Sequence, residues 1–176
     1  MKAVVQRVTD AAVTVNGALK GGITAGLLVY LGVARDDTPR DADWLIEKIP
    51  NLRIFDDKDG KMNLSLIDYI VNQQKETVNN TCVNQENGEV NTSPIGVLAV
   101  SQFTLLGDAR KGRRPTWDKA APPEKARELY QYFIEKMREK VPCESGEFQA
   151  HMKVAYTNDG PVTILLDSAL PGSADE

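Results

Sequence analysis

The spacing of apolar residues in the first third of the chain is typical of extended strands. Runs rich in β-branched residues cover residues 3–8, 12–15 and 27–33, and the pair Asn16-Gly17 follows the second run. An Asn-Gly pair between such runs is a strong signal for a tight hairpin turn. We therefore predict a hairpin near the N-terminal end. Further short strands are expected at residues 52–55, 95–105, 148–157 and 162–167.

Two other segments have the apolar period of amphipathic helices. The first opens at Thr38-Pro39, with Thr38 as the N-cap and Pro39 in the first turn, and the second opens at Pro122-Pro123. The residues expected to face the core are Ala42, Leu45, Ile46 and Ile49 in the first helix, and Ala126, Leu129, Tyr130, Phe133 and Met137 in the second. The pattern predicts an α/β domain: a layered mixed sheet, mainly antiparallel, with two principal helices.

One stretch, residues 72–94, has too few apolar positions to form an element of the core. It holds six Asn and three Gln against only four apolar residues. We interpret it as a mobile polar insertion in a single domain that spans residues 1–168. Residues 169–176 are expected to form a flexible tail.

The charge of the chain narrows the classes of partner. The 176 residues carry 21 Lys and Arg against 25 Asp and Glu, a net charge of -4. Such a chain does not adhere to nucleic acid or membranes through its overall charge, so any contact with RNA must be local. Four cations suited to that contact cluster in five positions, at Arg110, Lys111, Arg113 and Arg114. No apolar segment approaches the roughly 20 residues that span a bilayer, and no secretion signal is evident, so we expect a cytoplasmic protein.

Residues that bind metals or cofactors are scarce. One histidine and two separated cysteines, Cys82 and Cys143, exclude the usual catalytic zinc sets. Residues 107–112 have the glycine spacing of a phosphate-binding P-loop, but Arg113 and Arg114 occupy the positions that need Lys and Ser or Thr. We therefore expect neither a metal nor a cofactor.

Hydroxyl side chains at the end of a predicted strand are the candidate chemistry. Ser101-Gln102-Phe103-Thr104 follows the apolar run that begins at Ile95 and leads toward the basic cluster. Hydroxyls beside a cationic loop favour a site for a phosphate-bearing substrate, with RNA as the leading candidate.

Two other classes stay open at this point. His151 is the one histidine that could serve Ser101 or Thr104 as a base, but no G-x-S-x-G elbow surrounds either hydroxyl, which disfavours a serine-hydrolase triad. The other alternative is a non-catalytic RNA-binding module, in which the arginines grip phosphates and the hydroxyls only pair with RNA.

The segment Asn158-Asp159-Gly160-Pro161 carries two signals. Asp159-Gly160 is a hairpin signal, with Pro161 opening the return strand. A Gly-Pro bond also adopts the cis form at a cost of only about 0.5–1 kcal/mol. A cis bond would point two neighbouring carbonyls the same way, as a rigid acceptor pair suited to an amine.

Six ordered blocks of the sequence together resemble one known family, the D-aminoacyl-tRNA deacylases. The blocks are residues 1–8, 51–55, 101–105, 110–115, 120–123 and 158–163, and the resemblance covers residues 1–71 and 95–168. Six blocks at compatible spacing are far more specific than one short motif. In this family a tight turn usually replaces the stretch 72–94.

The resemblance implies a homodimeric cytoplasmic enzyme that releases D-amino acids from the 3′ end of tRNA, and also glycine mischarged on non-cognate tRNA. It implies no DNA contact and no membrane. The catalytic pocket it implies is formed by Ser101, Gln102, Phe103 and Thr104. The cis pair Gly160 and Pro161 would enter the partner's site as a chirality filter that rejects L-amino acids, supported by Arg7, Asn158 and Thr163. The residues expected to contact tRNA are Arg110, Lys111, Arg113 and Arg114.

Overall fold

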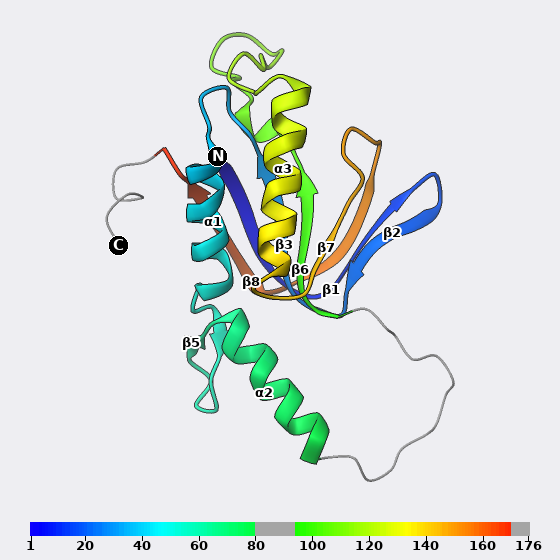
Figure 1. The fold of residues 1–176 in the computed structure, drawn as a ribbon, viewed down its shortest axis with the longest axis vertical. Helices are drawn as coiled ribbons and strands as arrows, with labels where there is room; N and C mark the ends of the chain where they lie inside the picture. Colours follow the sequence, from blue (N-terminus) through cyan, green and yellow to red (C-terminus); the bar gives the residue numbers. More distant parts are fainter. Residues whose placement is uncertain (80–93, 170–176) are drawn as a thin grey trace.

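The architecture is a six-stranded mixed sheet with two long helices packed on one face (Figure 1). The computed structural model describes residues 1–79 and 94–169. The strand order is β2-β1-β3-β6-β7, and β8 pairs with the other side of β1. The predicted α/β class with a layered mixed sheet is confirmed.

Strand β1 (Lys2–Val15) is the centre of the sheet and replaces two shorter predicted strands. It pairs antiparallel with β2 (Ala18–Ile23), β3 (Ala25–Gly32) and β8 (Lys153–Asp167). The hairpin predicted at Asn16-Gly17 is confirmed, since both residues have positive φ, 50° and 82°, between β1 and β2.

Strand β6 (Ile95–Ser101) runs parallel to β3 and to the short β7 (Cys143–Ser145). It ends earlier than the predicted residue 105, and Phe103–Leu106 form a 3-10 turn. Because β3 ends at Gly32, the chain beyond Ser101 has no parallel partner to extend the strand. The turn therefore lifts Phe103 and Thr104 out of the sheet.

The two predicted helices are present, as α1 (Pro39–Asn51) and α3 (Pro123–Arg138). Asp41 completes the predicted cap of α1, because its Oδ2 accepts a hydrogen bond of 2.8 Å from the N–H of Thr38. The predicted inner stripes are buried except for the half-buried Ala126, and they pack on the sheet residues Val5, Leu27, Val29 and Val97. This core fixes α3 above the end of β6.

A third helix, α2 (Leu66–Asn79), was not predicted, and it extends into the first residues of the stretch interpreted as a mobile polar insertion. Ser65 caps it, since its hydroxyl accepts a 3.1 Å hydrogen bond from the N–H of Asp68, and the Asp68 carboxylate accepts one of 3.0 Å from the N–H of Ser65. This local cap starts the helix. The helix was not predicted because its second half is polar in composition.

Two short strands, β4 (Phe55–Asp56) and β5 (Met62–Leu64), form a separate ribbon beside α2. Residues 80–93 of the predicted insertion and residues 170–176 of the predicted tail lie outside the described residues. Within the described ranges, no helix has both the length and the apolar content needed to cross a membrane.

The C-terminal hairpin prediction is wrong, because β8 is one continuous strand along β1. Its pairing places Gln6 opposite Thr163 and Val8 opposite Asn158, so residues 159–162 stand opposite Arg7 alone. The chain therefore does not reverse at Gly160. It bulges outward from the edge of the sheet and then resumes pairing with the same strand.

Candidate active site

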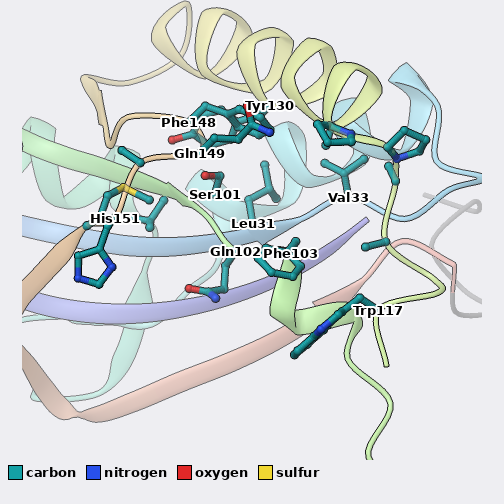
Figure 2. Close-up of a pocket in the computed structure, with 18 of the residues that line it drawn as sticks. Leu31, Val33, Ser101, Gln102, Phe103, Trp117, Tyr130, Phe148, Gln149 and His151 are labelled. Carbon is teal, nitrogen blue, oxygen red and sulfur yellow. The ribbon is translucent and has the colours of Figure 1, made fainter. Parts of the chain in front are cut away.

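A cavity of about 820 Å³ opens where β6 ends beneath the start of α3 (Figure 2). The strand ends contribute Leu31 and the predicted residues Ser101, Gln102 and Phe103. The other walls come from residues 120–123 and 148–152. The lining combines apolar side chains with a few hydroxyl and amide groups and the guanidinium of Arg35, which suits a ring system bearing polar edges.

Thr104 lies outside this lining, although it was predicted in the same motif. Its side chain is exposed, and its hydroxyl accepts a hydrogen bond from Nε2 of Gln102. Ser101 is half-buried within the cavity. The structure thus brings together three members of the motif and uses the fourth to hold the amide of Gln102.

Tyr130 of α3 anchors the strand end from above. Its hydroxyl donates a 2.9 Å hydrogen bond to the carbonyl of Ala99, two residues before Ser101. Burial raises the pKa of Tyr130, so the phenol stays neutral and acts as a structural donor.

A loop just before β8 forms the second wall, and Arg127 of α3 holds it in place. The guanidinium of Arg127 lies 4.8 Å from the centre of the Phe148 ring, and its Nη2 donates a 2.8 Å hydrogen bond to Oε1 of Gln149. Gln149 has a φ of 64°, which is rare for a residue with a side chain. Residues 148–152 were predicted as strand, so sequence reasoning missed this wall.

His151 lies in this loop rather than in a strand, and it is exposed. Figure 2 shows its ring at the end of the cavity opposite Trp117. Among the described residues, no hydrogen bond joins His151 to Ser101 or Thr104. The geometry therefore gives no support to a hydrolase triad.

The pair Gly160 and Pro161 is exposed on the bulge of β8, and neither residue lines the cavity of its own chain. Their peptide bond is cis, and Gly160 has a φ of 117°. A Cβ at position 160 would lie 2.7 Å from a methyl of Val162, so only glycine fits there.

Polar side chains brace this bulge from within. The N–H of Val162 donates a 3.1 Å hydrogen bond to Oδ1 of Asn158. The amides of Asn158 and Gln6 both donate to the hydroxyl of Thr163, each at 3.1 Å. Asn158 and Thr163, predicted as supporting residues, thus lie on either side of the Gly160-Pro161 pair and are bonded to each other.

Arg7 lies beneath the same bulge and is only 7% exposed. Its Nη1 donates a 2.7 Å hydrogen bond to the carbonyl of Ile54, and its Nε lies 2.9 Å from Oδ2 of Asp159. The Nε–H does not point at that oxygen, so the second contact is an ion pair without an aligned hydrogen bond.

The basic cluster occupies a separate exposed loop. Two backbone hydrogen bonds of 2.9 Å between Asp108 and Thr116 close its base. Arg110 pairs with Asp108 and holds the pKa of that carboxyl well below its usual range. Within the described part of the chain, Lys111, Arg113 and Arg114 have no carboxylate partner and face solvent. The loop does not line the cavity, but it adjoins Trp117, which does.

No group of three or more His, Cys, Asp or Glu side chains within residues 1–79 and 94–169 could hold a metal ion. The cavity lining itself is poor in such groups, with His151 as its one member of these four types. What the arrangement offers chemically is a largely apolar hollow with a few hydroxyl and amide groups and one cationic side chain, Arg35.

Comparison with known proteins gives concordant matches over nearly the whole chain. A family model described as D-Tyr-tRNA(Tyr) deacylase matches residues 4–75 and 70–167. A Kosmotoga olearia protein named D-aminoacyl-tRNA deacylase is 53% identical over 168 residues, covering 96% of this chain and 97% of its own length. A Thermosipho melanesiensis protein of the same name is 52% identical over 170 residues, with coverage of 96% and 97%.

Two solved structures share the fold. One, titled c-Myc DNA Unwinding Element Binding Protein, has a TM-score of 0.78 and 37% identity, covering 97% of this chain and 100% of its own. The other, titled as a probable eukaryotic D-amino acid tRNA deacylase, has a TM-score of 0.65 at 15% identity, covering 94% and 97%. The second likeness concerns the fold alone.

Proposed function

The chain belongs to the D-Tyr-tRNA(Tyr) deacylase family, and we propose that it hydrolyses the ester between a D-amino acid and the 3′ end of tRNA. The observation that carries the proposal is that Ser101, Gln102 and Phe103 line one cavity in a chain 53% identical, nearly end to end, to a protein named for this activity. The activity places the protein among the hydrolases, and we propose that it acts in the cytoplasm.

The chemistry we propose needs positioning more than an enzyme base. An aminoacyl ester is already reactive, so holding it and stabilising the oxyanion supply much of the catalysis. The first N–H groups of a helical turn have no partner inside that turn, which leaves those of Phe103 and Thr104 for the oxyanion. One such donor is worth about 2.7–4 kcal/mol.

The proton acceptor in this mechanism belongs to the substrate. Burial keeps the Tyr130 phenol protonated, and His151 makes no hydrogen bond to the motif within the described residues. We assign the role to the ribose 2′-OH beside the ester, which accepts a proton from the attacking water while it passes its own proton to the departing 3′ oxygen. RNA has this group and DNA lacks it. Ser101 then serves to hydrogen-bond the substrate within the cavity.

A homodimer is the second part of the proposal, supported by an apolar row on the sheet face opposite the helices. Val4 pairs with Leu165 on one side and with Tyr30 on the other, so the three side chains run across the sheet. Leu165 is 76% exposed and Tyr30 and Val4 are only half-buried. An exposed row of this kind across β8, β1 and β3 fits a second copy of the same chain.

The chirality filter is the third part. Gly160 and Pro161 project from an edge strand and are braced by Asn158 and Thr163, yet they are outside the cavity of their own chain. We therefore place them in the cavity of the partner, where their carbonyls accept the α-amino group of the substrate. A D side chain then points to solvent and an L side chain meets the wall, so discrimination works by exclusion.

Such a filter has a consequence for glycine. Glycine has no side chain to exclude, so glycyl-tRNA is also hydrolysed. The exposed Arg110, Lys111, Arg113 and Arg114 contact the tRNA phosphates, which fixes position without reading sequence.

The test is the release of amino acid from D-, L- and glycyl-tRNA by the purified protein. We expect the D- and glycyl-esters to be hydrolysed and the L-ester to be spared. RNA binding without release from any of them would instead identify a non-catalytic RNA-binding module. Equal hydrolysis of D- and L-esters would retain the deacylase and exclude the filter.

A further inference from the structure

We propose that Trp117, together with Phe103, is a stacking platform for the nucleotide that precedes the terminal adenosine of the tRNA. The inference rests on the proposed function only in taking the 3′ end of tRNA as the ligand. It assigns a binding site at the end of the cavity where these two rings lie.

The two rings are unusually open for their size. Trp117 is 40% exposed and Phe103 is 56% exposed, and both lie at the same end of the cavity (Figure 2). Their centroids are 5.3 Å apart at an interplanar angle of 70°, an edge-to-face contact. Neither ring belongs to the two buried apolar clusters of the described residues. Packing of the fold therefore does not account for either of them.

The indole of Trp117 lies against the backbone at Gly107 rather than against a mobile side chain. A Cβ at Gly107 would lie 2.6 Å from Cζ3 of Trp117, so glycine is needed for the ring to sit there. The N–H of Gly107 is bonded to the carbonyl of Thr104 at 3.0 Å, and the Asp108–Thr116 bridge adjoins both. A ring fixed in advance loses little conformational entropy when a base stacks on it.

Positively charged side chains lie on the Trp117 side of the cavity, where we expect the RNA strand to leave it. The Asp108–Thr116 bridge also closes the basic loop, and Trp117 directly follows Thr116. Lys111, Arg113 and Arg114 therefore lie in a loop that ends beside Trp117. Arg35 lines the cavity as well. Sites for single-stranded nucleic acid combine aromatic rings for the bases with a cationic track for the backbone. Here a chain leaving the cavity past Trp117 meets that track at once.

Fluorescence tests this site without any hydrolysis. The chain has two tryptophans, so Trp44→Phe leaves Trp117 as the sole reporter. We expect a non-acylated CCA trinucleotide to quench its emission and adenosine 5′-monophosphate to leave it nearly unchanged. Equal quenching by both ligands, or by neither, would overturn the proposal. If the wild-type protein had no deacylase activity, the proposed function would be wrong, but the quenching experiment would still test the stacking site independently.

Kinetics test the same site by comparing two substrates. Stacking is worth about 1–3 kcal/mol per base, so Trp117→Ala should lower the ratio of kcat/KM on D-aminoacyl-tRNA to that on D-aminoacyl-adenosine about tenfold. Trp117→Phe, which keeps a ring, should restore most of the ratio. Equal losses on both substrates would show that the indole contacts the aminoacyl group instead. A dimer that dissociates in Trp117→Ala would show that a second copy covers the ring, and would also overturn the proposal.

Discussion

Arg7 of the central strand reaches Asp159 on the edge strand, with its Nε 2.9 Å from Oδ2. The same guanidinium is bonded to the carbonyl of Ile54, so it ties the bulge of β8 to the segment that leads into β4. One buried side chain therefore connects the body of the domain to the Gly160-Pro161 pair. This relationship explains how an exposed bulge keeps a fixed position.

Removing that connection should cost stability and discrimination together. In Arg7→Ala the buried carbonyl of Ile54 loses its donor, which we expect to lower the free energy of unfolding by about 1–3 kcal/mol. The bulge loses its support at the same time, so the ratio of D- to L-ester hydrolysis should fall. Urea unfolding and paired deacylation assays measure the two effects.

Lys2→Ala is the matched control, because Lys2 also lies on β1 but forms an exposed 3.5 Å pair with Asp167. Exposed pairs contribute little, so we expect a change of about 0–0.5 kcal/mol and unchanged discrimination. If Arg7→Ala kept the full D to L ratio in a folded protein, the proposed link from Arg7 to the filter would be wrong.

The basic loop should control the salt dependence of tRNA binding. Arg114 has no carboxylate partner within the described part of the chain, so its charge is available to a phosphate. In Arg114→Ala we expect weaker binding and a slope of log K against log salt that is shallower by about 0.7. Lys58→Ala, an exposed cation on the turn between β4 and β5, should leave the slope unchanged. Equal slopes in the two variants would show that the basic loop does not contact the tRNA.

Thr104 should be dispensable for the bond-breaking step. Its hydroxyl accepts a hydrogen bond from Gln102 and lies outside the cavity lining. We expect Thr104→Ala to keep most of its turnover. Removal of a general acid or base would instead lower the rate by about 10²–10⁴-fold. A substrate ending in 2′-deoxyadenosine should instead lose turnover in the wild type. Single-turnover assays with both substrates compare these effects, and an inactive Thr104→Ala that folds and binds normally would favour a covalent threonine.

The parts of the structure that the sequence predicted are those fixed by neighbouring residues. Helix α1 follows from Thr38, Pro39 and its apolar stripe, and the β1–β2 hairpin from Asn16-Gly17. These signals act within a few positions of the elements they specify. The family motif likewise identified three residues of the cavity before its shape was known.

The parts that escaped prediction are fixed across the sheet or from another element. Asp159-Gly160 is a local hairpin signal, but pairing of β8 with β1 on both sides of it outweighs that preference. The wall at residues 148–152 takes its shape from Arg127, which no local pattern connects to it. Trp117 likewise has no sequence signal of its own, because its value lies in being exposed beside Phe103.

Arg127 should affect substrate binding without touching the cavity. In Arg127→Met the stem remains, but the ring contact with Phe148 and the hydrogen bond to Gln149 are lost. These two contacts together favour the observed loop conformation by about 1–2 kcal/mol. We expect KM for D-aminoacyl-tRNA to rise by up to about tenfold while kcat stays within about twofold. Glu128→Ala, at an exposed neighbouring position of α3, is the control and should change neither value.

Cys143 should be inert in the folded protein and should make stability fall at alkaline pH. Burial raises the pKa of its thiol to about 12, against an ordinary value of 9.0. The unfolded chain therefore loses this proton between about pH 9 and 12 while the folded chain keeps it, so ionisation favours unfolding across that window. In a Cys82→Ser background, we expect a thiol reagent at pH 8 to leave Cys143 unmodified until denaturant is added. Rapid modification of the folded protein would contradict this, because only an accessible thiolate reacts quickly.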